Sequence, residues 1–595
     1  MVVFDSLTTF RPVSRCLGWV WSGIVATFLG CTTELELPGN PTNRLVVVLD
    51  APPRAFDPRF SIDTMSAKVS KLMFSALVHV DNPSVVPEPL LAASITPDAG
   101  SATRWHVFVR RDVLFHDGTP LTGHDVVYTF KSILDPELGS PYRADFDAKF
   151  RDIILDPTDP FHVIFELEQP LATFLTDLDM GIVPAHLLQN TGTGGRFPES
   201  GWIGAGPFRF VRFDGHSTLV LRRSDTTAHI RPTYEWLVLR VLADDNARLL
   251  SLLAGSADLM INGISPILVD TLKNRDDVRV YTEPSLAFTY LGLNLRVPAL
   301  SDVRVRQALS LATDRDEIIR VRFSGLATPA RGILPSFHWA YNEQLPAPGF
   351  DPARAEQLLD EAGFPRDPVS GIRFSLELKL SNHRFRRGIA EMIVWQWAKV
   401  GVAVTLRPYE FATFFADVQK GRFDVFLLQL PEPIEPDMIR WMLYSLQTPT
   451  KERGTGLSPY AHWDRRFFNP GWDTLLGDPL CDHWAKQSYV HGVIRLVETI
   501  VGSPIDLGST NRTYYANPRL DCLVDMGRQT ADRQQRKRLY AEAQSVVAQD
   551  LPILPLWHEN HIALGSPRLR GVSLLPTSRL SFVTKLTGNM DQEVE

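Results

Sequence analysis

Hydrophobic and polar positions alternate most regularly in the middle of the chain. FSLELKLS at 374–381 has an apolar residue at every second position, and VAVTLRP at 402–408 repeats the pattern, so both predict strands. Helix-length stretches follow at 384–400 and 411–420, and each stops at a glycine. FDVFLLQL at 423–430 is almost continuously apolar, as in a strand buried on both faces. This alternation of strand and helix with short turns predicts parallel βαβ units.

Capping residues mark three helices upstream of this region. SDVRVRQALSLA is predicted to begin at Ser301 or Asp302, and another helix is predicted to begin at Asp314. In DPARAEQLLDEAGF, Asp351 precedes a proline at the first helical position, and Gly363 follows the last apolar residue.

Shorter strands and helices mix less regularly before residue 290. Further strands are predicted at LVVVLD (45–50), RWHVFVR (104–110), HVIFELEQP (162–170), TLVLRR (218–223) and YEWLVLRVLAD (234–244). The chain of 595 residues is too long for one ordinary domain. It is therefore predicted to be an α/β protein of two or more lobes.

The stretch FHDGTPLTGHDVVYTF contains His116, Asp117, His124 and Asp125 within ten positions, which could indicate a metal site or an acid/base pair. A structural interpretation explains the same residues. FHDGTP is a turn, and Thr122 with Asp125 three positions later is close to a capping box at the start of a helix. A metal site needs three or four converging ligands, and the spacing of the two histidines is not a standard one. We favour the structural interpretation.

WHENH near the C-terminus offers His558 and His561 as a second metal candidate. A lone His-x-x-His beside LPILPLW is more often part of a strand with two ordinary histidines. The sequence has no His-Glu-x-x-His, Walker loop, Gly-x-Ser-x-Gly or dinucleotide-binding fingerprint. We predict no metal, no cofactor and no catalytic role. An enzyme that uses His558/His561 or His116/His124 remains an alternative.

Topology indicates a different kind of site. In open α/β sheets, ligands bind outside the carboxyl ends of the strands. The residues that follow or end the three central strands are Ser381, Asn382, His383, Tyr409, Phe411, Gln429 and Glu432. Aromatic walls with a few polar anchors suit a polar or zwitterionic organic ligand. The alternative is that Glu432 and Glu435 are only solvated acids in a loop.

The N-terminus has the pattern of an export signal. Arg11 and Arg15 precede CLGWVWSGIVATFLGC, which is short for a membrane-spanning helix. It resembles a bacterial lipoprotein signal, so residues 1–30 are predicted to be removed and Cys31 to be lipidated, with 31–43 as a tether. A plain signal peptide or an uncleaved anchor is the alternative.

The cysteine content fits export, and the charge excludes one class of partner. The formal net charge is −7, which does not suggest a nucleic-acid partner. The mature chain would keep only Cys481 and Cys522, which could pair in an oxidising compartment.

Five segments in order resemble family 5 extracellular solute-binding proteins, the oligopeptide-, dipeptide- and nickel-binding receptors of ABC importers. These are FHDGTPLTGHDVVYTF, GAGPFRF (204–210), YLGLNLRVPALSDVRVRQALSLATDRDEII (290–319), ARAEQLLDEAGF (353–364) and YYANPRLDCLV (514–524). The resemblance covers nearly the whole mature chain.

The resemblance implies a hinge-connected, two-lobed periplasmic-binding-protein fold of type II with an extra subdomain. By similarity, lobe I comprises 44–85, 206–285 and 555–595, the extra subdomain comprises 86–205, and lobe II comprises 286–554. A stretch at about 445–510 is longer than usual for the family and is predicted to be an insertion.

The resemblance also assigns roles in the cleft. Peptide-binding members have an acid after the strand that corresponds to FDVFLLQL, and it pairs with the α-amino group of the ligand. Glu432 holds that place, where family members more often have Asp. Tyr142 and Phe60 lie where the family lines the other side of the cleft.

We therefore expect a periplasmic or cell-surface lipoprotein that captures peptides and delivers them to an ABC permease and its ATPase, and we expect it to be a monomer. One alternative is the same fold binding a nickel chelate, haem or an oligosaccharide. Another is a signalling receptor.

Overall fold

The computed structural model describes residues 37–99, 101–189, 195–198, 201–226, 230–262, 264–445, 472–488 and 510–588. The predicted signal segment, Cys31 and most of the predicted insertion lie outside these residues. Within them, no helix is both long and apolar enough to cross a membrane. All described residues from Gly39 onward belong to one compact unit.

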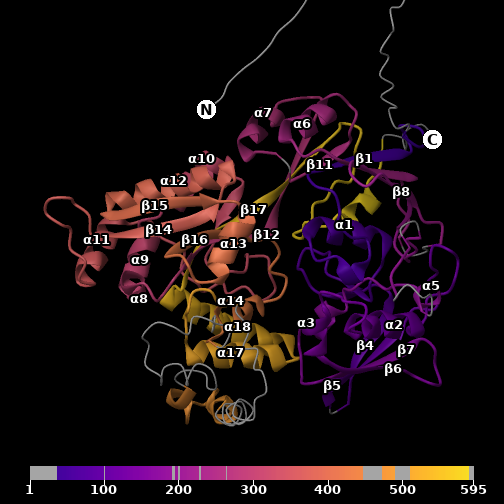
Figure 1. The fold of residues 1–595 in the computed structure, drawn as a ribbon, viewed down its shortest axis with the longest axis horizontal. Coiled ribbons are helices and arrows are strands. Elements are labelled where there is room, and N and C mark those ends of the chain that lie inside the picture. The colour runs from indigo at the N-terminus through magenta and orange to yellow at the C-terminus, as the bar shows by residue number, and fades with distance from the viewer. Residues whose placement is uncertain are drawn as a thin grey trace, which may run out of the picture. The chain divides into compact units, whose positions relative to one another are not determined.

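A single eleven-stranded sheet runs through both halves of this unit (Figure 1). Its strand order is β15-β14-β16-β12-β17-β11-β1-β10-β9-β8, with β13 paired to β17 off this path. The strands are β1 (Arg44–Leu49), β8 (Phe208–Phe213), β9 (Thr218–Arg223), β10 (Trp236–Val241), β11 (Leu259–Ile261), β12 (Arg279–Leu293), β13 (Ala327–Pro329), β14 (Phe374–Ser381), β15 (Val402–Tyr409), β16 (Val425–Leu430) and β17 (Ile553–Gly565).

The predicted βαβαβ run is confirmed. Strand β14 lies between β15 and β16 and pairs in parallel with both. The connections are α12 (Arg384–Lys399) and α13 (Phe411–Gln419). The nearly continuous apolar run of β16 is explained by burial on both faces, because Val425 and Leu427 pack in one core while Phe426 and Leu430 pack in the other.

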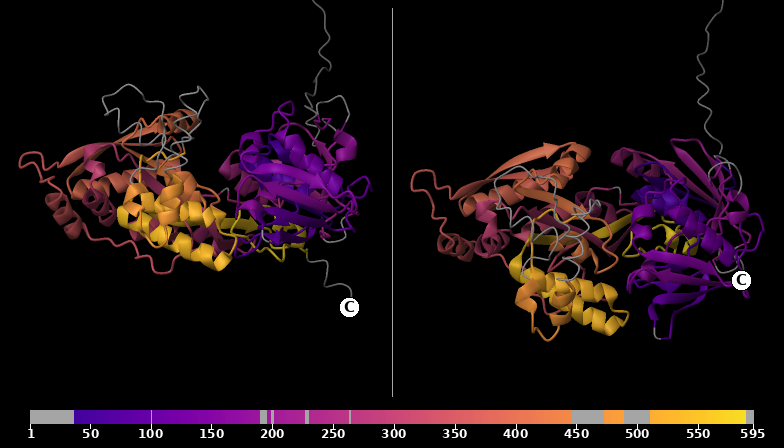
Figure 2. Two further views of the ribbon diagram at one scale, coloured as in Figure 1. Left: turned by 90° about the horizontal axis from the view of Figure 1, so that it is seen from below. Right: turned by 60° about the horizontal axis from the view of Figure 1, so that its bottom comes forward.

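Helices cover both faces of this half of the sheet. One core is formed with α8 (Pro298–Ser301), α9 (Val303–Leu311), α10 (Arg315–Phe323), α11 (Pro352–Glu361) and α12. The other is formed with α13, α14 (Met438–Leu443), α17 (Pro518–Gln529) and α18 (Arg533–Asp550), and the last two lie side by side (Figure 2). The predicted caps Asp302, Asp314 and Asp351 each accept a hydrogen bond from the first turn of their helix.

The two halves of the sheet are joined by the long strands β12 and β17, which are antiparallel to each other. The first part of β12 pairs with the last part of β17, and its second part pairs with the beginning of β17. The register shifts between Pro284 and Phe288, where proline removes a backbone donor. The sequence-based boundary at 285/286 falls in this irregular segment. The sequence-based boundary at 554/555 falls inside β17. His558 of β17 still pairs with Phe288 in the second part of β12, so this part of β17 belongs to the second half of the sheet.

In the other half, β1 lies between β10 and β11 and is parallel to both. Strands β9 and β8 extend the edge in antiparallel fashion. The core of this half includes side chains of α1 (Thr64–Met73), of these strands and of the 3-10 helix Ser581–Lys585. The helices α6 (Asp245–Leu253) and α7 (Val269–Lys273) complete this half.

A separate four-stranded sheet, β4-β5-β7-β6, forms the predicted extra subdomain. Its elements are β4 (Ala92–Asp98), β5 (Ser101–Val109), α2 (Gly123–Leu134), α3 (Arg143–Asp147), β6 (Phe150–Leu155), β7 (His162–Leu167), α4 (Phe174–Asp177) and α5 (Ala185–Leu188). The short strands β2 (Val78–His79) and β3 (Glu88–Pro89) precede it. Helix α2 begins with the predicted capping box of Thr122 and Asp125.

The FHDGTP turn attaches this subdomain to the GAGPFRF segment. The backbone of Gly204 donates to His116 Nδ1 over 3.2 Å, so Nε2 carries the proton and donates to the Gly206 carbonyl over 2.9 Å. Gly206 N in turn donates to the Met73 carbonyl at the end of α1 over 2.8 Å. His116 therefore holds the chain segment that returns from the subdomain to β8.

A disulfide links Cys481 to Cys522 of α17, with Cα atoms 6.0 Å apart. Both cysteines are buried in a small cluster with Leu475, Trp484 and Ala485. The described part of the predicted insertion is thus held against lobe-II helices by a covalent bond and apolar packing.

We expect Gly204→Ala to destabilise the fold. A Cβ atom at residue 204 would lie 2.1 Å from the Met73 carbonyl oxygen, which belongs to the backbone and cannot move away alone. Overpacking of this kind costs about 1–3 kcal/mol, measurable as a lower urea midpoint with unchanged slope. Gly349→Ala is the matched control, because its nearest neighbour would be Leu311 Cδ2 at 3.5 Å. Equal urea midpoints for Gly204→Ala and Gly349→Ala would show that the close approach of residue 204 to Met73 does not limit stability.

Candidate ligand-binding site

The carboxyl ends of the three parallel strands meet at one edge of the sheet. Ser381 lies directly opposite Tyr409, and Gln429 lies opposite Thr289 of β12. The backbone of Asn382 donates to the Tyr409 carbonyl over 2.7 Å, which ties the ends of β14 and β15 together. The sequence-based inference that these residues lie on the same edge agrees with this register.

The side chains at this edge differ in exposure. Phe411 is 54% exposed at the start of α13 and stacks on Phe415, whereas Ser381 is buried. Asn382 and His383 are exposed. Gln429 accepts a hydrogen bond from Arg386 over 3.0 Å. The edge therefore offers an aromatic face together with amide and hydroxyl groups.

Glu432 follows β16 and reaches across to the C-terminal segment of the first half. Its Oε1 accepts hydrogen bonds from the backbone N–H of Ser578, over 2.8 Å, and from the hydroxyl of the same residue. Its Oε2 makes no hydrogen bond or ion pair with the part of the chain that the structure describes. One carboxylate oxygen thus joins the two halves, and the other has no hydrogen-bond or ion-pair partner among the described residues.

The facing side contributes a group of polar residues near Glu432. Lys68 of α1 lies close enough to Glu432 and Asp50 for their charges to act on it. Burial lowers the pKa of Lys68, and the two carboxylates oppose this shift. Asp50 directly follows β1, so it marks the carboxyl edge of the parallel strands in this half. The charges that follow β1 and β16 therefore both act on Lys68.

His561 of β17 is held neutral beside this group. The backbone of Ile562 donates to Asn262 Oδ1, so the Asn262 amide nitrogen donates to His561 Nδ1 over 2.8 Å. Nε2 then carries the proton and donates to the Pro576 carbonyl over 3.1 Å. Burial lowers the pKa of His561 to about 4, and the charge of Lys68 acts in the same direction.

A nearly buried charge network underlies the Ser578 segment. Arg579 pairs with Asp81 over 3.2 Å and with Asp179 over 2.7 Å, and Lys71 pairs with Asp179 over 2.6 Å. Burial would lower the pKa of Arg579, but the Asp179 and Asp81 carboxylates outweigh it and raise that pKa. The network fixes the segment that contacts Glu432.

Tyr142 and Phe60 lie where the first half meets the extra subdomain. The Tyr142 hydroxyl donates to the Ser61 carbonyl over 2.9 Å, and Arg196 lies over the Phe60 ring, 4.6 Å from its centroid. In the described part of the chain, no hydrogen bond or ion pair joins either residue to Glu432. The structure brings these two residues near each other but not into contact with the acid.

Additional contacts hold the extra subdomain against helices of lobe II. Glu435 accepts from the Thr176 hydroxyl and pairs with Arg536 over 2.8 Å. The backbone of Ala172 donates to the Arg528 carbonyl over 2.7 Å. Both oxygens of Glu435 therefore have internal partners, whereas only one oxygen of Glu432 has a partner among the described residues.

The histidines proposed as alternative metal ligands do not converge. His558 and His561 are three positions apart on one strand, so their side chains point to opposite faces. His558 packs against Phe288, with ring centroids 5.3 Å apart, and burial lowers its pKa to about 4. Both nitrogens of His116 are bonded to backbone groups. Among the described residues, no group of three His, Cys, Asp or Glu side chains could hold a metal ion.

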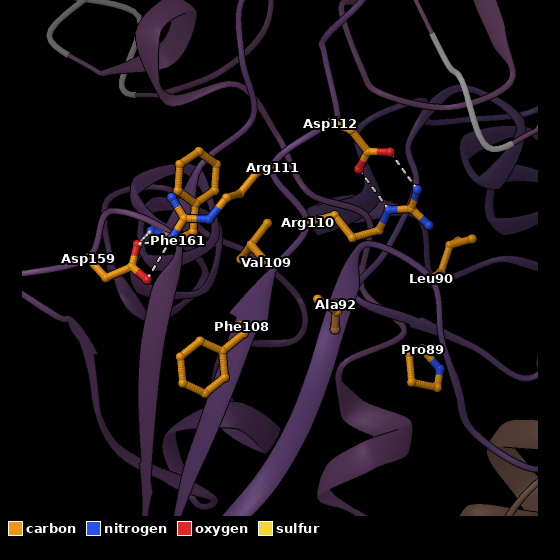
Figure 3. Close-up of a pocket in the computed structure, with 11 residues that line it drawn as sticks. Pro89, Leu90, Ala92, Phe108, Val109, Arg110, Arg111, Asp112, Asp159 and Phe161 are labelled. Atoms are coloured by element: carbon orange, nitrogen blue, oxygen red, sulfur yellow. Dashed lines mark hydrogen bonds and ion pairs between the residues drawn. The ribbon is translucent and has the colours of Figure 1, made fainter.

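A pocket of about 640 Å³ lies elsewhere, on the extra subdomain (Figure 3). Leu90, Phe108 and Phe161 contribute to its apolar lining. Its two arginines are paired within the subdomain, Arg110 with Asp112 and Arg111 with Asp159, as the dashed lines mark. Because its charges are matched locally and its lining comes from one subdomain, this pocket gives no support for a ligand held between lobes.

Sequence reasoning did not place Ser578, the hydrogen-bond partner of Glu432, or the groups on which the charge of Glu432 acts, namely Lys68, His561 and Arg579. It also did not place Asp50, whose charge acts on Lys68. Only Asp50 carried a local signal, because it ends the predicted strand LVVVLD. The others reach the site from a helix, a sheet strand and a C-terminal loop that no short-range pattern connects.

We expect the His561→Gln variant to lose less stability than the wild type when the pH falls. The pKa of His561 falls from about 6.5 when unfolded to about 4 when folded. Its neutral form thus contributes stability that is complete above pH ~6.5 and is lost as the pH falls toward 4. Glutamine can keep both hydrogen bonds and does not titrate.

The measurement is the free energy of unfolding of both proteins at pH 7 and pH 5. The decrease should be smaller in the variant by about 1–2 kcal/mol. The comparison of the two proteins cancels the contributions of titrating groups that both contain. Asp177 is one such group: burial raises its pKa to about 6, so its contribution to stability changes with pH in the opposite direction. Parallel pH profiles would show that folding does not lower the pKa of His561.

Comparisons with known proteins give a consistent result. Residues 86–450 match the family model described as bacterial extracellular solute-binding proteins, family 5 Middle. Heme-binding protein A of Haemophilus influenzae is 26% identical over 566 residues, covering 91% of this chain and 91% of that protein. Probable di/tripeptide-binding protein 5 of Pseudomonas aeruginosa is 25% identical over 562 residues, covering 90% of this chain and 94% of that protein.

The fold agrees with this assignment. The solved structure of the oligopeptide-binding protein AppA from Bacillus subtilis with a nonapeptide superposes with a TM-score of 0.67 at 22% identity, covering 92% of this chain and 100% of that one. The predicted two-lobed α/β architecture is thereby confirmed. Because the family model covers more than half of the sequence, the chain belongs to the extracellular solute-binding proteins of family 5.

Proposed function

We propose that this protein captures peptides in the cleft between its lobes and that Glu432 binds their α-ammonium group. The observation that carries the proposal is the position of this carboxylate at the strand edge, with one oxygen held by Ser578 and the other without a partner in the part of the chain that the structure describes. A carboxylate fixed in this way is preorganised, so it needs little reordering to accept a cationic donor.

The surrounding residues suit the rest of a peptide. Phe411 and Tyr409 provide apolar walls, while Ser381, Asn382, His383 and Gln429 provide polar groups along the strand ends. Tyr142 and Phe60 are proposed to line the opposite side. The relative named for di- and tripeptides, and the solved structure with a nonapeptide, support peptides as the ligand class.

Delivery to a membrane transporter completes the proposal. We assign no catalytic step to the protein, and we propose that ligand binding closes the lobes about the β12/β17 segment, after which the closed form docks on an ABC permease that works with its ATPase. The proposed division keeps 44–85, 206–285 and 555–595 in lobe I, 86–205 in the extra subdomain and 286–554 in lobe II. Export, lipidation at Cys31 and a monomeric state are part of the same proposal.

The test is peptide binding by Glu432→Gln. After removal of any co-purified ligand, calorimetric titration with di-, tri- and tetra-alanine should show binding to the wild type and weaker binding of the N-acetylated peptides. Glutamine removes the charge that makes this hydrogen bond strong, so the unmodified peptides should bind about 10- to 100-fold more weakly to the variant.

Glu391→Gln is the control, because Glu391 is an exposed acid of α12 paired with Arg387. Its affinity for alanine peptides should equal that of the wild type. Equal affinities for Glu432→Gln and wild type would exclude Glu432 as the anchor. Binding of haem, a nickel chelate or an oligosaccharide in place of every peptide, checked by mass spectrometry of co-purified ligand, would overturn the peptide assignment.

A further inference from the structure

Arg512 is a buried cation without an acidic partner. It lies in the segment that leads into α17, and only 7% of the residue is exposed. Its side chain makes no hydrogen bond or ion pair with any residue that the structure describes, and its Nε is buried without an acceptor. Burial lowers the pKa of Arg512, and among the described residues only the phenol of Tyr290 opposes this shift. No carboxylate of the described chain therefore compensates this guanidinium group.

Two aromatic rings contact the guanidinium group instead. The Cζ atom of Arg512 lies 4.8 Å from the centroid of the Phe415 ring and 5.2 Å from a ring centroid of Trp441. Both distances are within the range of a cation–π contact. Such contacts offset part of the unfavourable burial of the charge, but they do not accept the hydrogen bonds that water would accept. The N–H groups of Arg512 are thus left without acceptors in the described chain.

The end of the side chain reaches the surface. The two terminal nitrogens, Nη1 and Nη2, make no hydrogen bond within the described chain, but unlike Nε they are not fully buried. Trp441 beside them is 39% exposed. The guanidinium fork is therefore accessible next to aromatic surface, while the stem that carries it is held inside. A fixed planar fork is suited to a carboxylate, which can accept two parallel N–H bonds.

A row of aromatic rings connects Arg512 with the proposed binding edge. Phe411 directly follows the edge residues of β15, is 54% exposed, and stacks on Phe415 one helical turn further along α13, with ring centroids 5.8 Å apart. Phe415 in turn contacts Arg512. From the other side, Trp441 belongs to α14, the helix that follows Glu432 in the chain. The guanidinium group thus lies at the end of a row of rings that begins at the strand ends.

We propose that Arg512 binds the carboxylate of an acidic side chain of the ligand, so that the protein prefers peptides that contain glutamate or aspartate. This inference rests on the proposed function, in which Glu432 holds the α-ammonium group. The side-chain carboxylate accepts hydrogen bonds from the two terminal nitrogens of Arg512, and its methylene groups pack on Phe415 and Trp441. The preference concerns a side chain and adds to whatever holds the two ends of the peptide.

The competing interpretation is that Arg512 only packs its stem against the rings and keeps its end hydrated. That role predicts no preference for acidic ligands, and it predicts that replacement of Arg512 lowers stability through lost packing. The binding role predicts the opposite on both points, because a largely buried cation without an acid is unfavourable in the ligand-free protein. Ligand preference and stability therefore separate the two interpretations.

The experiment compares alanine tripeptides that carry glutamate or glutamine at the first, second or third position, by calorimetric titration of the wild type and of Arg512→Met. At one of these positions the wild type should prefer glutamate over glutamine by about 10- to 100-fold. Arg512→Met keeps an apolar stem but removes the charge, so it should lose this preference through weaker binding of the glutamate peptide. Arg512→Lys should keep part of the preference, because it keeps the charge without the planar fork.

Arg422→Met is the control, because Arg422 is exposed just after α13 and is paired with Asp417 over 2.9 Å. It removes the same charge and should leave the preference for glutamate unchanged. Stability of the ligand-free proteins is the second readout. The urea midpoint of Arg512→Met should equal or exceed that of the wild type.

Two results would overturn the inference and leave the peptide function intact. One is equal affinity of the wild type for the glutamate and glutamine peptides at all three positions. The other is a preference for glutamate that persists in Arg512→Met, and a lower urea midpoint in that variant would then assign Arg512 to packing alone. If the wild type binds no alanine tripeptide, the proposed function fails and this inference fails with it.

Discussion

The antiparallel pairing of β12 with β17 is the constraint on which the two lobes depend. These strands are long enough to contribute to both halves of the sheet, so each half is completed by residues from the same pair. The register shift after Pro284 interrupts regular pairing where the halves meet. Local irregularity in an otherwise continuous ladder gives a connection that can bend without separating the lobes.

This arrangement also determines where the charges lie. Asp50 follows β1 in one half and Glu432 follows β16 in the other, and the charges of both act on Lys68 of α1. A segment from the far C-terminus then supplies Ser578 and the buried Arg579 network. Within the described residues, Glu432 keeps one oxygen without a partner, whereas the charges of Arg579, Asp81 and Asp179 beneath it are paired. That difference is the reason to propose Glu432, and not the paired network, as the ligand anchor.

Several features followed directly from short-range sequence patterns. Alternation and caps located β14, α12, β15 and the helices after Asp302, Asp314 and Asp351, because period and capping depend on residues a few positions apart. The FHDGTPLTGHDVVYTF stretch was assigned to turn and capping roles, and His116, Thr122 and Asp125 all make bonds of that kind. The same logic placed Ser381, Tyr409 and Gln429 on one edge, since parallel strands share their carboxyl ends.

The sequence by itself therefore determined the α/β character, the βαβαβ order and the acid that follows β16. The tertiary structure alone decided which groups face that acid. Lys68, His561 and Ser578 are separated from Glu432 by more than a hundred positions, so no periodicity or motif could connect them. Their meeting depends on the β12/β17 pairing and on the packing of α1, and such long-range contacts are set by the fold as a whole.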